Sequence, residues 1–156
     1  MRWLVAFSTL FATGAIYAAD SDLLPPEQAF VVEAHAADQG TVKARWIIAD
    51  GYYLYRERIS FEIETPGYQL GTPRYPAGKI KEDPFFGRTE TYRHQVLIDL
   101  PIEHRAAGGA TLVLIARSQG CADLGVCYPP QERRVTIELP KQSRWLQPAY
   151  RLIAAH

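Results

Sequence analysis

The chain has 156 residues, and its 17 Lys and Arg residues balance its 17 Asp and Glu residues. Because no block of basic residues interrupts this balance, nucleic acid is not expected as a partner. After the first 18 residues, no apolar stretch is long enough to span a bilayer, so we expect no transmembrane segment in the mature chain.

Residues 1–18 are predicted to form a secretory signal peptide. Arg2 precedes the apolar run WLVAFSTLFATGAIYA, and Ala18 stands before Ala19 and Asp20 as a cleavage site. The run is short, and the sequence after it is acidic and rich in proline, which favours cleavage over retention as an anchor. The remainder is long enough for one domain, predicted over residues 19–140, followed by a tail or linker over residues 141–156.

Short runs that alternate apolar and polar residues predict β-strands along this domain. The clearest run covers residues 41–49, where every second residue from Val42 to Ile48 is apolar. Asp50-Gly51 follows it and is a strong signal for a tight turn. The predicted strands cover residues 30–35, 41–49, 59–64, 95–102, 110–118 and 134–139. With no convincing helical period, this pattern predicts an all-β antiparallel sandwich or barrel.

Residues 71–93 fit the strand pattern poorly and are expected to form a long loop. The segment is rich in Gly and Pro and contains KEDPFFG at residues 81–87. Two phenylalanines, Phe85 and Phe86, stand among charged residues there. Either one of them plugs the end of the core, or they cover another feature of the surface. The residues alone favour the plug.

Cys121 and Cys127 are the two cysteines of the chain, and both lie in CADLGVCYPP at residues 121–130. In an oxidising compartment they are expected to pair. A disulfide around so small a ring contributes only about 2–2.5 kcal/mol in the chain-entropy model. The flanking strands resemble a hairpin that would hold the sulfurs together whether or not they are bonded, which suits reversible pairing.

The spacing of the cysteines differs from the C-x-x-C of a thioredoxin site. Nearby acids, Asp123 and, if their loop lies close, Glu82 and Asp83, would raise the thiol pKa values and make the pair a poor attacking nucleophile. Two interpretations remain open from the residues: a structural disulfide, which is commoner in secreted proteins, and a redox-active pair.

No cofactor or metal site is predicted. The histidines, at positions 35, 94, 104 and 156, are scattered without the spacing of metal ligands. The sequence contains no P-loop, no dinucleotide-binding fingerprint and no G-x-S-x-G motif.

Three stretches together resemble one known family. DGYYLYR (50–56), KEDPFFGRTETYR (81–93) and GCADLGVCYPP (120–130) are similar to the amino-terminal periplasmic domain of the thiol:disulfide interchange protein DsbD, in the same order and at the same separations. The resemblance covers roughly residues 24–140. It implies an immunoglobulin-like antiparallel β-sandwich with a long cap loop, located in the periplasm, whose cysteine pair alternates between dithiol and disulfide.

The resemblance also implies an activity and partners. The domain would be a thiol:disulfide oxidoreductase that takes electrons from a thioredoxin-like donor domain. It would pass them to periplasmic disulfide isomerases or to a thioredoxin-like protein of cytochrome c maturation. Because the family's membrane segments and thioredoxin-like domain do not follow, the chain is expected to be a stand-alone relative or a fragment.

The site residues implied by the resemblance fall into three groups. The redox pair is Cys121 and Cys127, and Cys127 carries the sulfur that bonds to partners. The aromatic residues beside it correspond to Tyr53 and Tyr55. The cap loop, in which the first phenylalanine shields the sulfurs, corresponds to Asp83, Pro84, Phe85, Phe86 and Gly87.

This cap loop departs from the family at two positions. Pro84 stands where some relatives have an acidic residue, and Phe86 where some have tyrosine. The competing hypothesis is an immunoglobulin-like binding or assembly module with a purely structural disulfide. A reduction potential far below that of periplasmic shuttles would favour it.

Overall fold

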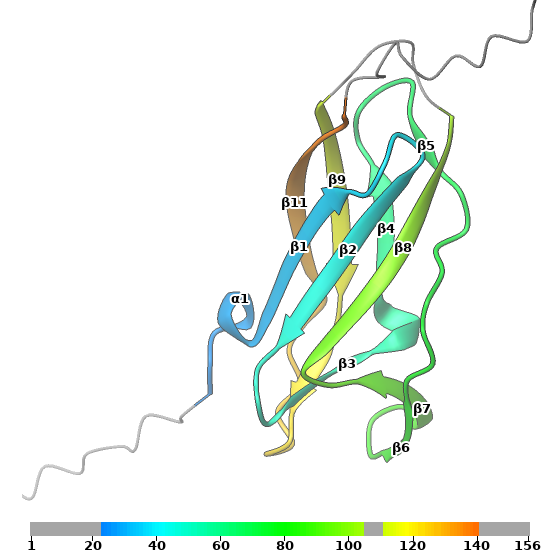
Figure 1. Ribbon diagram of the computed structural model, residues 1–156. Coiled ribbons are helices and arrows are strands. Elements are labelled where there is room, and N and C mark those ends of the chain that lie inside the picture. The colour runs from blue at the N-terminus through cyan, green and yellow to red at the C-terminus, as the bar shows by residue number, and fades with distance from the viewer. Residues whose placement is uncertain (1–22, 105–110, 141–156) are drawn as a thin grey trace, which may run out of the picture.

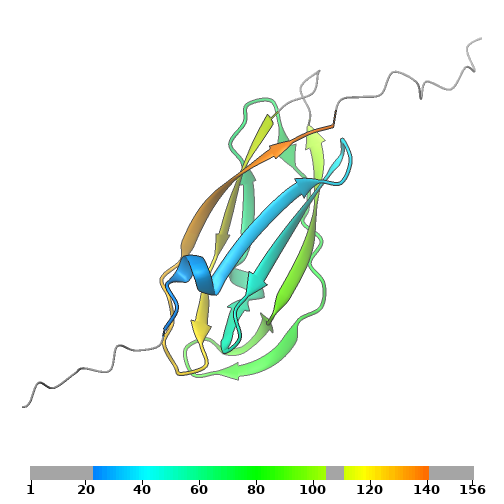
Figure 2. The same cartoon turned by 60° about the vertical axis from the view of Figure 1, so that its left-hand side comes forward.

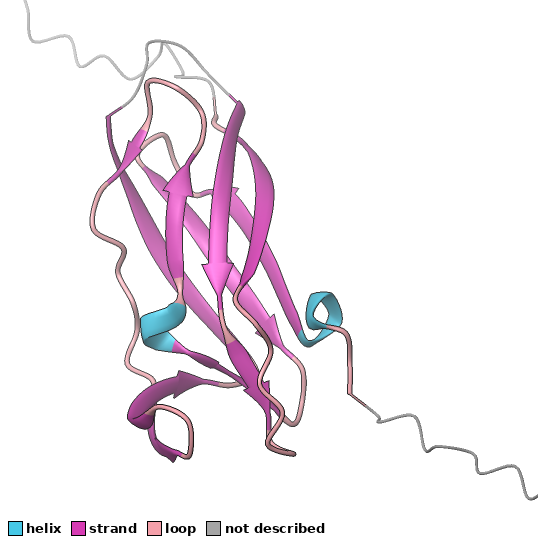
Figure 3. Ribbon diagram, turned by 180° about the vertical axis from the view of Figure 1, so that it is seen from behind, coloured by secondary structure: helices cyan, strands magenta, loops and turns pink. Residues whose placement is uncertain are grey.

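The computed structural model describes residues 23–104 and 111–140. The predicted signal peptide and the predicted tail lie outside these residues. Strands dominate the described part, and its helical segments are two short turns (Figure 3). The elements are α1 (Pro26–Ala29), β1 (Phe30–Ala36), β2 (Thr41–Ile48), β3 (Tyr52–Tyr55), the 3-10 turn η1 (Arg56–Arg58), β4 (Ser60–Ile63), β5 (Gln69–Leu70), β6 (Lys79–Asp83), β7 (Gly87–Tyr92), β8 (Gln95–His104), β9 (Thr111–Ser118), β10 (Gly120–Ala122) and β11 (Gln131–Glu138).

The strands form three antiparallel sheets. One has the order β1-β2-β8-β5, and a second, β11-β9-β4, lies across the core from it (Figure 1). The third, β10-β3-β7-β6, lies at one end of the sandwich, the lower end in Figure 1. The prediction of an all-β antiparallel sandwich is confirmed. None of the helices in the described ranges is long and apolar enough to cross a membrane.

The core lies between the two main sheets, and the predicted alternation explains it. Along β2, Val42, Ala44 and Trp46 are almost completely buried, while Arg45 between them is exposed. The neighbouring strand β8 and the strand β9 of the facing sheet contribute apolar side chains in the same alternating way. The largest of these are Ile98, Leu100, Leu112 and Leu114. Burial of such side chains contributes about 1.5–3 kcal/mol each before entropy costs, so the two main sheets carry the stability of the fold.

The expectation of a long loop over residues 71–93 is only partly correct. Its second half is a β-hairpin in which β6 pairs with β7 from Lys79↔Thr91 to Asp83↔Gly87. This hairpin shows little alternation of apolar and polar residues, because it lies at the end of the sandwich, where few of its side chains reach the core. The cap residues form the turn of the hairpin, and Gly87 has φ of 67°, a conformation that favours glycine.

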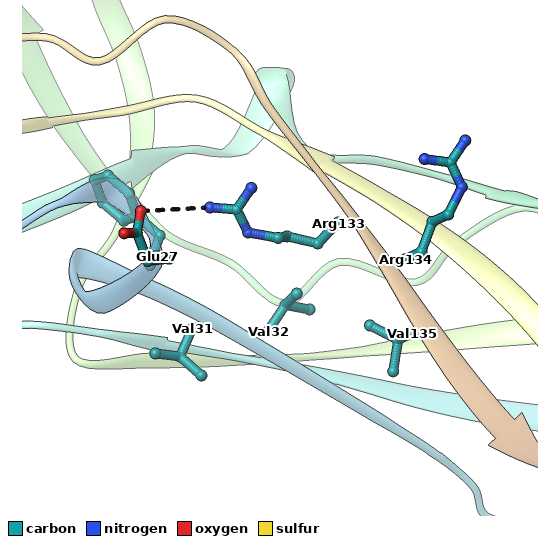
Figure 4. A pocket seen from close by; sticks show the side chains of 7 residues that line it. Glu27, Val31, Val32, Arg133, Arg134 and Val135 are labelled. Carbon is teal, nitrogen blue, oxygen red and sulfur yellow. Dashed lines mark ion pairs between the residues drawn. The ribbon is translucent and has the colours of Figure 1, made fainter.

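β1 and β11 lie at the same edge of the sandwich, beside α1 (Figure 2). They belong to different sheets and leave a cavity of about 230 Å³ between them. Val31, Val32 and Val135 line it, and Glu27 and Arg133 form an ion pair of 3.9 Å across it (Figure 4). α1, which contributes Glu27 to this cavity, lies on the opposite side of the molecule from the hairpin β6–β7 (Figure 1).

Candidate functional site

The two cysteines form a disulfide between adjacent extended segments at the end of the sandwich. Cys121 lies in β10 and pairs with Cys127 through an isolated antiparallel bridge, with 4.0 Å between their Cα atoms. The turn between them is closed by the amide of Ala122, which donates to the carbonyl of Val126 at 2.8 Å. Cys121 is completely buried, whereas Cys127 is partly exposed. Cys127 is therefore the member of the pair that reaches the surface.

Gly120 explains how β10 comes so close to its neighbours. A Cβ at this position would collide with the carbonyl oxygen of Tyr53 and would lie 2.7 Å from the ring of Phe30. Because both atoms belong to packed groups, a larger residue would push β10 away from β3. The glycine thus brings Cys121 directly opposite Tyr53, its partner in the strand register.

Two tyrosines of β3 lie in one cluster with the disulfide. The hydroxyl of Tyr55 lies 3.1 Å from Sγ of Cys121 and 3.9 Å from Sγ of Cys127. Since a disulfide sulfur carries no hydrogen, the hydroxyl is the donor. The ring of Tyr53 packs edge-on against that of Tyr55 at 5.4 Å. Burial raises the pKa of Tyr55 above its ordinary value, and the neighbouring Tyr53 adds to this effect.

Asp83 is a buried carboxylate that joins the tyrosines to the cap loop. One oxygen, Oδ2, accepts hydrogen bonds from the hydroxyl of Tyr53 at 2.7 Å and from Lys81 at 3.0 Å. The other, Oδ1, accepts from the amides of Phe85 at 2.9 Å and Phe86 at 3.2 Å. Burial alone would raise the pKa of Asp83, but the bonds from Tyr53, Lys81 and the Phe85 amide hold it far below its usual range.

The two phenylalanines of the cap loop have different surroundings. The ring of Phe86 packs edge-on against Tyr55 at 4.8 Å, and the guanidinium of Arg58 lies over the Phe86 ring, 4.8 Å from its centre. Phe85, to which the resemblance assigns the shielding of the sulfurs, is 56% exposed. Pro84 and Gly87 are exposed as well. The ring that the structure brings against the tyrosines is therefore that of Phe86.

The turn between the cysteines is held by an ion pair. Arg93, between β7 and β8, donates from Nη1 to one carboxylate oxygen of Asp123 at 2.9 Å and from Nη2 to the other at 2.6 Å. The same guanidinium lies 5.2 Å from the centre of the Tyr53 ring. Its hydrogen bonds hold the pKa of Asp123 below the usual range. The acidic neighbour expected from the sequence is thus paired with a cation.

The disulfide packs in a small cluster of its own. Tyr53, Tyr55 and Cys121 form it, with Cys127 against them, and it is separate from the large cluster between the main sheets. Opening the disulfide would consequently leave the main core untouched. Among the described residues, no three His, Cys, Asp or Glu side chains gather closely enough to hold a metal ion.

Sequence reasoning missed two members of this site, Lys81 and Arg93. A signal for Lys81 was present, because in a strand it shares a face with Asp83, two residues later. That signal required residues 79–83 to be recognised as a strand. For Arg93 the sequence offered none, since its partner Asp123 lies 30 positions away on another element.

The comparisons with known proteins agree with this geometry. The model of the family described as "Thiol:disulfide interchange protein DsbD, N-terminal" matches residues 20–139. A DsbD from Neisseria meningitidis is 43% identical over 140 residues, which cover 88% of this chain and 23% of the relative. A DsbD from Ralstonia nicotianae is 42% identical over 153 residues, covering 97% of this chain and 24% of the relative. The chain thus spans about a quarter of the length of these relatives.

Two solved structures are also similar. One is the N-terminal domain of DsbD from Neisseria meningitidis in the reduced form, with a TM-score of 0.67 and 43% identity over 75% of this chain and 90% of that one. The other is a complex between the DsbD and PilB N-terminal domains from the same organism, with a TM-score of 0.62 and 40% identity over 78% of this chain and 95% of that one. Together with the strand order and the disulfide, these matches show that this chain belongs to the family of the N-terminal domain of the thiol:disulfide interchange protein DsbD.

Proposed function

We propose that this domain, formed by residues 19–140, is a periplasmic thiol:disulfide oxidoreductase whose Cys121–Cys127 pair opens and closes reversibly. The observation that carries the proposal is the placement of the disulfide in a small cluster outside the main core, with one of its two cysteine residues partly exposed. A relative at 43% identity has been solved in the reduced form, which supports the existence of a stable dithiol state. Residues 1–18 would direct export and be removed.

The reaction is an exchange of two electrons and two protons with a partner dithiol. A partner thiolate attacks Sγ of Cys127, the Cys121–Cys127 bond breaks, and Cys121 leaves with the electron pair and takes up a proton. A second partner thiol then attacks the mixed disulfide, so that the partner leaves oxidised and the domain remains as a dithiol. In the reverse direction, the Cys127 thiolate attacks the disulfide of an acceptor.

The partners we propose are thioredoxin-like proteins. The donor is a thioredoxin-like domain, and the acceptors are periplasmic disulfide isomerases or a thioredoxin-like protein of cytochrome c maturation. The solved complex of a related DsbD N-terminal domain with a PilB N-terminal domain supports a protein partner for this site.

The reduction potential separates this function from a structural disulfide. We expect a value between about −120 and −270 mV, the range of thioredoxin and the periplasmic shuttles, when the protein is equilibrated with glutathione or dithiothreitol buffers. A value below about −300 mV would identify a structural disulfide and would contradict the proposal.

Reduction should leave the domain folded. The chain on both sides of the ring is anchored independently of the disulfide, because the amide of Tyr128 donates to the carbonyl of Gly120 at 3.0 Å and its hydroxyl donates to the carbonyl of Leu24 at 2.6 Å. We expect reduction to lower the melting temperature by about 5–15 °C, the equivalent of about 2–2.5 kcal/mol. Thermal unfolding with and without dithiothreitol measures this, and loss of the fold at room temperature would contradict it.

The cap loop is proposed to protect the sulfurs from small oxidants. Removing either phenylalanine should speed the oxidation of the dithiol by hydrogen peroxide, but the two variants should differ in stability. Phe86→Ala should cost about 1–2 kcal/mol, because its ring packs on Tyr55. Phe85→Ala should cost less than about 1 kcal/mol, because its ring is largely exposed.

Melting temperature and oxidation rate are measured on both cap variants. Ile80→Ala is the matched control, since Ile80 is an exposed apolar residue, at 59%, on the same hairpin. Unchanged oxidation in both phenylalanine variants would remove the protective role of the cap loop.

A further inference from the structure

The charged groups around the disulfide are arranged in two neutral pairs. The buried carboxylate of Asp83 is paired with Lys81, and the carboxylate of Asp123 is paired with Arg93. Both cations lie over the ring of Tyr53, Lys81 at 4.4 Å and Arg93 at 5.2 Å from its centre. This ring belongs to the cluster that contains the sulfurs. Asp83 and Asp123 therefore each have their own cation.

The Asp123–Arg93 pair also fixes the turn that joins the cysteines. Asp123 lies two residues after Cys121, at the start of this turn, and its amide donates to the carbonyl of Gly51 at 2.7 Å. Its carboxylate accepts hydrogen bonds from both terminal nitrogens of the Arg93 guanidinium, and Nη1 of Arg93 also donates to the carbonyl of Tyr52 at 3.4 Å. A bidentate contact of this kind fixes the relative orientation of the two side chains and also pairs their charges.

We propose that Arg93 is a positioning residue for thiol–disulfide exchange, which cancels the negative charge of Asp123 beside the cysteines and holds their turn in place when the disulfide opens. This inference rests on the proposed function. It differs from the sequence-based expectation that the acids near the pair act on the thiols as free negative charges. The reduced cysteines instead face a neutral pair.

The inference predicts shifts of opposite sign when each member of the pair is removed. With Arg93→Gln, Asp123 is left as an uncompensated negative charge, which disfavours a nearby thiolate. With Asp123→Asn, Arg93 is left as an uncompensated positive charge, which favours it. Because the pair is partly exposed and salt screens it, each shift in the thiol pKa should be about half a pH unit. The double variant should return to the parent value.

The other charged and titratable groups near the cysteines and near the Arg93–Asp123 ion pair remain the same in all of these variants. Around the cysteines they are Lys81, Asp83, Tyr53 and Tyr55, and next to Arg93 and Gly51 they are His94 and Asp50, which form an exposed ion pair. The shifts can therefore be assigned to the Arg93–Asp123 pair. Arg93→Lys keeps the charge but loses the bidentate contact, so it should keep the parent pKa while it loosens the turn.

The experiment measures the pKa of the Cys127 thiol in a Cys121→Ala background, from the pH dependence of alkylation by iodoacetamide. The control is Arg45→Gln, which removes the guanidinium of an ion pair with Glu33, at 2.6 Å, on the β1–β2 strands. Circular dichroism verifies that each variant is folded. If Arg93→Gln does not fold, Asp123→Asn still tests the sign of the predicted shift in the thiol pKa, because Asp123 lies in an exposed turn.

Opposite shifts in the two single variants, with the parent value in the double variant, support the inference. Shifts of the same sign, or shifts no larger than that of the Arg45→Gln control, overturn it. The thiol pKa is measured without any partner, so this result stands apart from the reduction potential that tests the proposed function. A structural disulfide would fail the potential test and leave the pKa result interpretable.

Discussion

Cys121→Ser should form a stable mixed disulfide with a thioredoxin-fold partner, and Cys127→Ser should not. Cys127 is partly exposed, whereas Cys121 is completely buried between β3 and the turn. Since exchange requires access to the attacked or attacking sulfur, we expect the Cys121→Ser variant to yield about tenfold more mixed disulfide or better. The yield is measured by non-reducing electrophoresis after incubation with a single-cysteine thioredoxin whose thiol carries a thionitrobenzoate group, so that the thiolate of the variant displaces thionitrobenzoate and forms the mixed disulfide.

The variant lacking both cysteines is the control for non-specific products. Equal yields from the two single variants would contradict the assignment of Cys127 as the sulfur that bonds to partners. In that case the cap loop would have to open far enough to uncover Cys121, which the burial of this residue in the oxidised state does not indicate.

Asp83→Asn should destabilise the domain by about 2–3 kcal/mol at neutral pH, the cost of losing charge-assisted hydrogen bonds in a buried site. An asparagine offers one oxygen where the carboxylate offers two. Its amide group would therefore point a donor either at Tyr53 and Lys81 or at the backbone amides of Phe85 and Phe86, all of which are donors to Asp83. Urea unfolding measures the loss, and Glu82→Gln, on the same hairpin but exposed, is the control.

The effect of Asp83 should also depend on pH. Its pKa in the folded protein is depressed, so the carboxylate stabilises the fold at every pH above its unfolded pKa of about 3.9. This contribution is lost as the pH falls below that value toward the lower folded pKa. The difference between the parent and Asp83→Asn should therefore be constant from pH 7 to pH 5 and shrink below pH 4. A difference that stays unchanged down to pH 2 would show that the ionisation of Asp83 does not contribute to the stability of the fold.

The sandwich could be predicted from the sequence because its strands are half-buried. In β2 and β9, alternate side chains face the core, so burial leaves a two-residue period. β3 leaves no such period, because all four of its residues are buried: Tyr52 and Leu54 face the main core, whereas Tyr53 and Tyr55 face the disulfide. The hairpin β6–β7 is specified by hydrogen bonds and charges, which apolar patterns do not report.

The site was predictable only in part for the same reason. The cysteines and the aromatic motif stand out as unusual residues in a short stretch. The contacts of Asp83 with Tyr53, and of Arg93 with Asp123, join residues 30 positions apart. Such contacts depend on the register of β3 against β10 and β7, which the sequence does not specify. Phe85 and Phe86 are neighbours in sequence, so the choice of the ring that packs on Tyr55 required the geometry of the turn.

The two ends of the sandwich bear on how the domain can be attached to a surface. The described chain finishes at Pro140, after β11, at the end of the sandwich opposite β3, β6 and β7 (Figure 1). An electrode or a sensor chip coupled through a group placed after Pro140 would present the disulfide to the solution. Coupling before Leu24 would bring the surface close to the site, because Leu24 is hydrogen-bonded to Tyr52 and Tyr128, the neighbours of Tyr53 and Cys127. Solution partners should therefore reach the cysteine pair when the domain is immobilised after Pro140, whereas immobilisation before Leu24 should place the pair next to the electrode, where direct voltammetry can detect it.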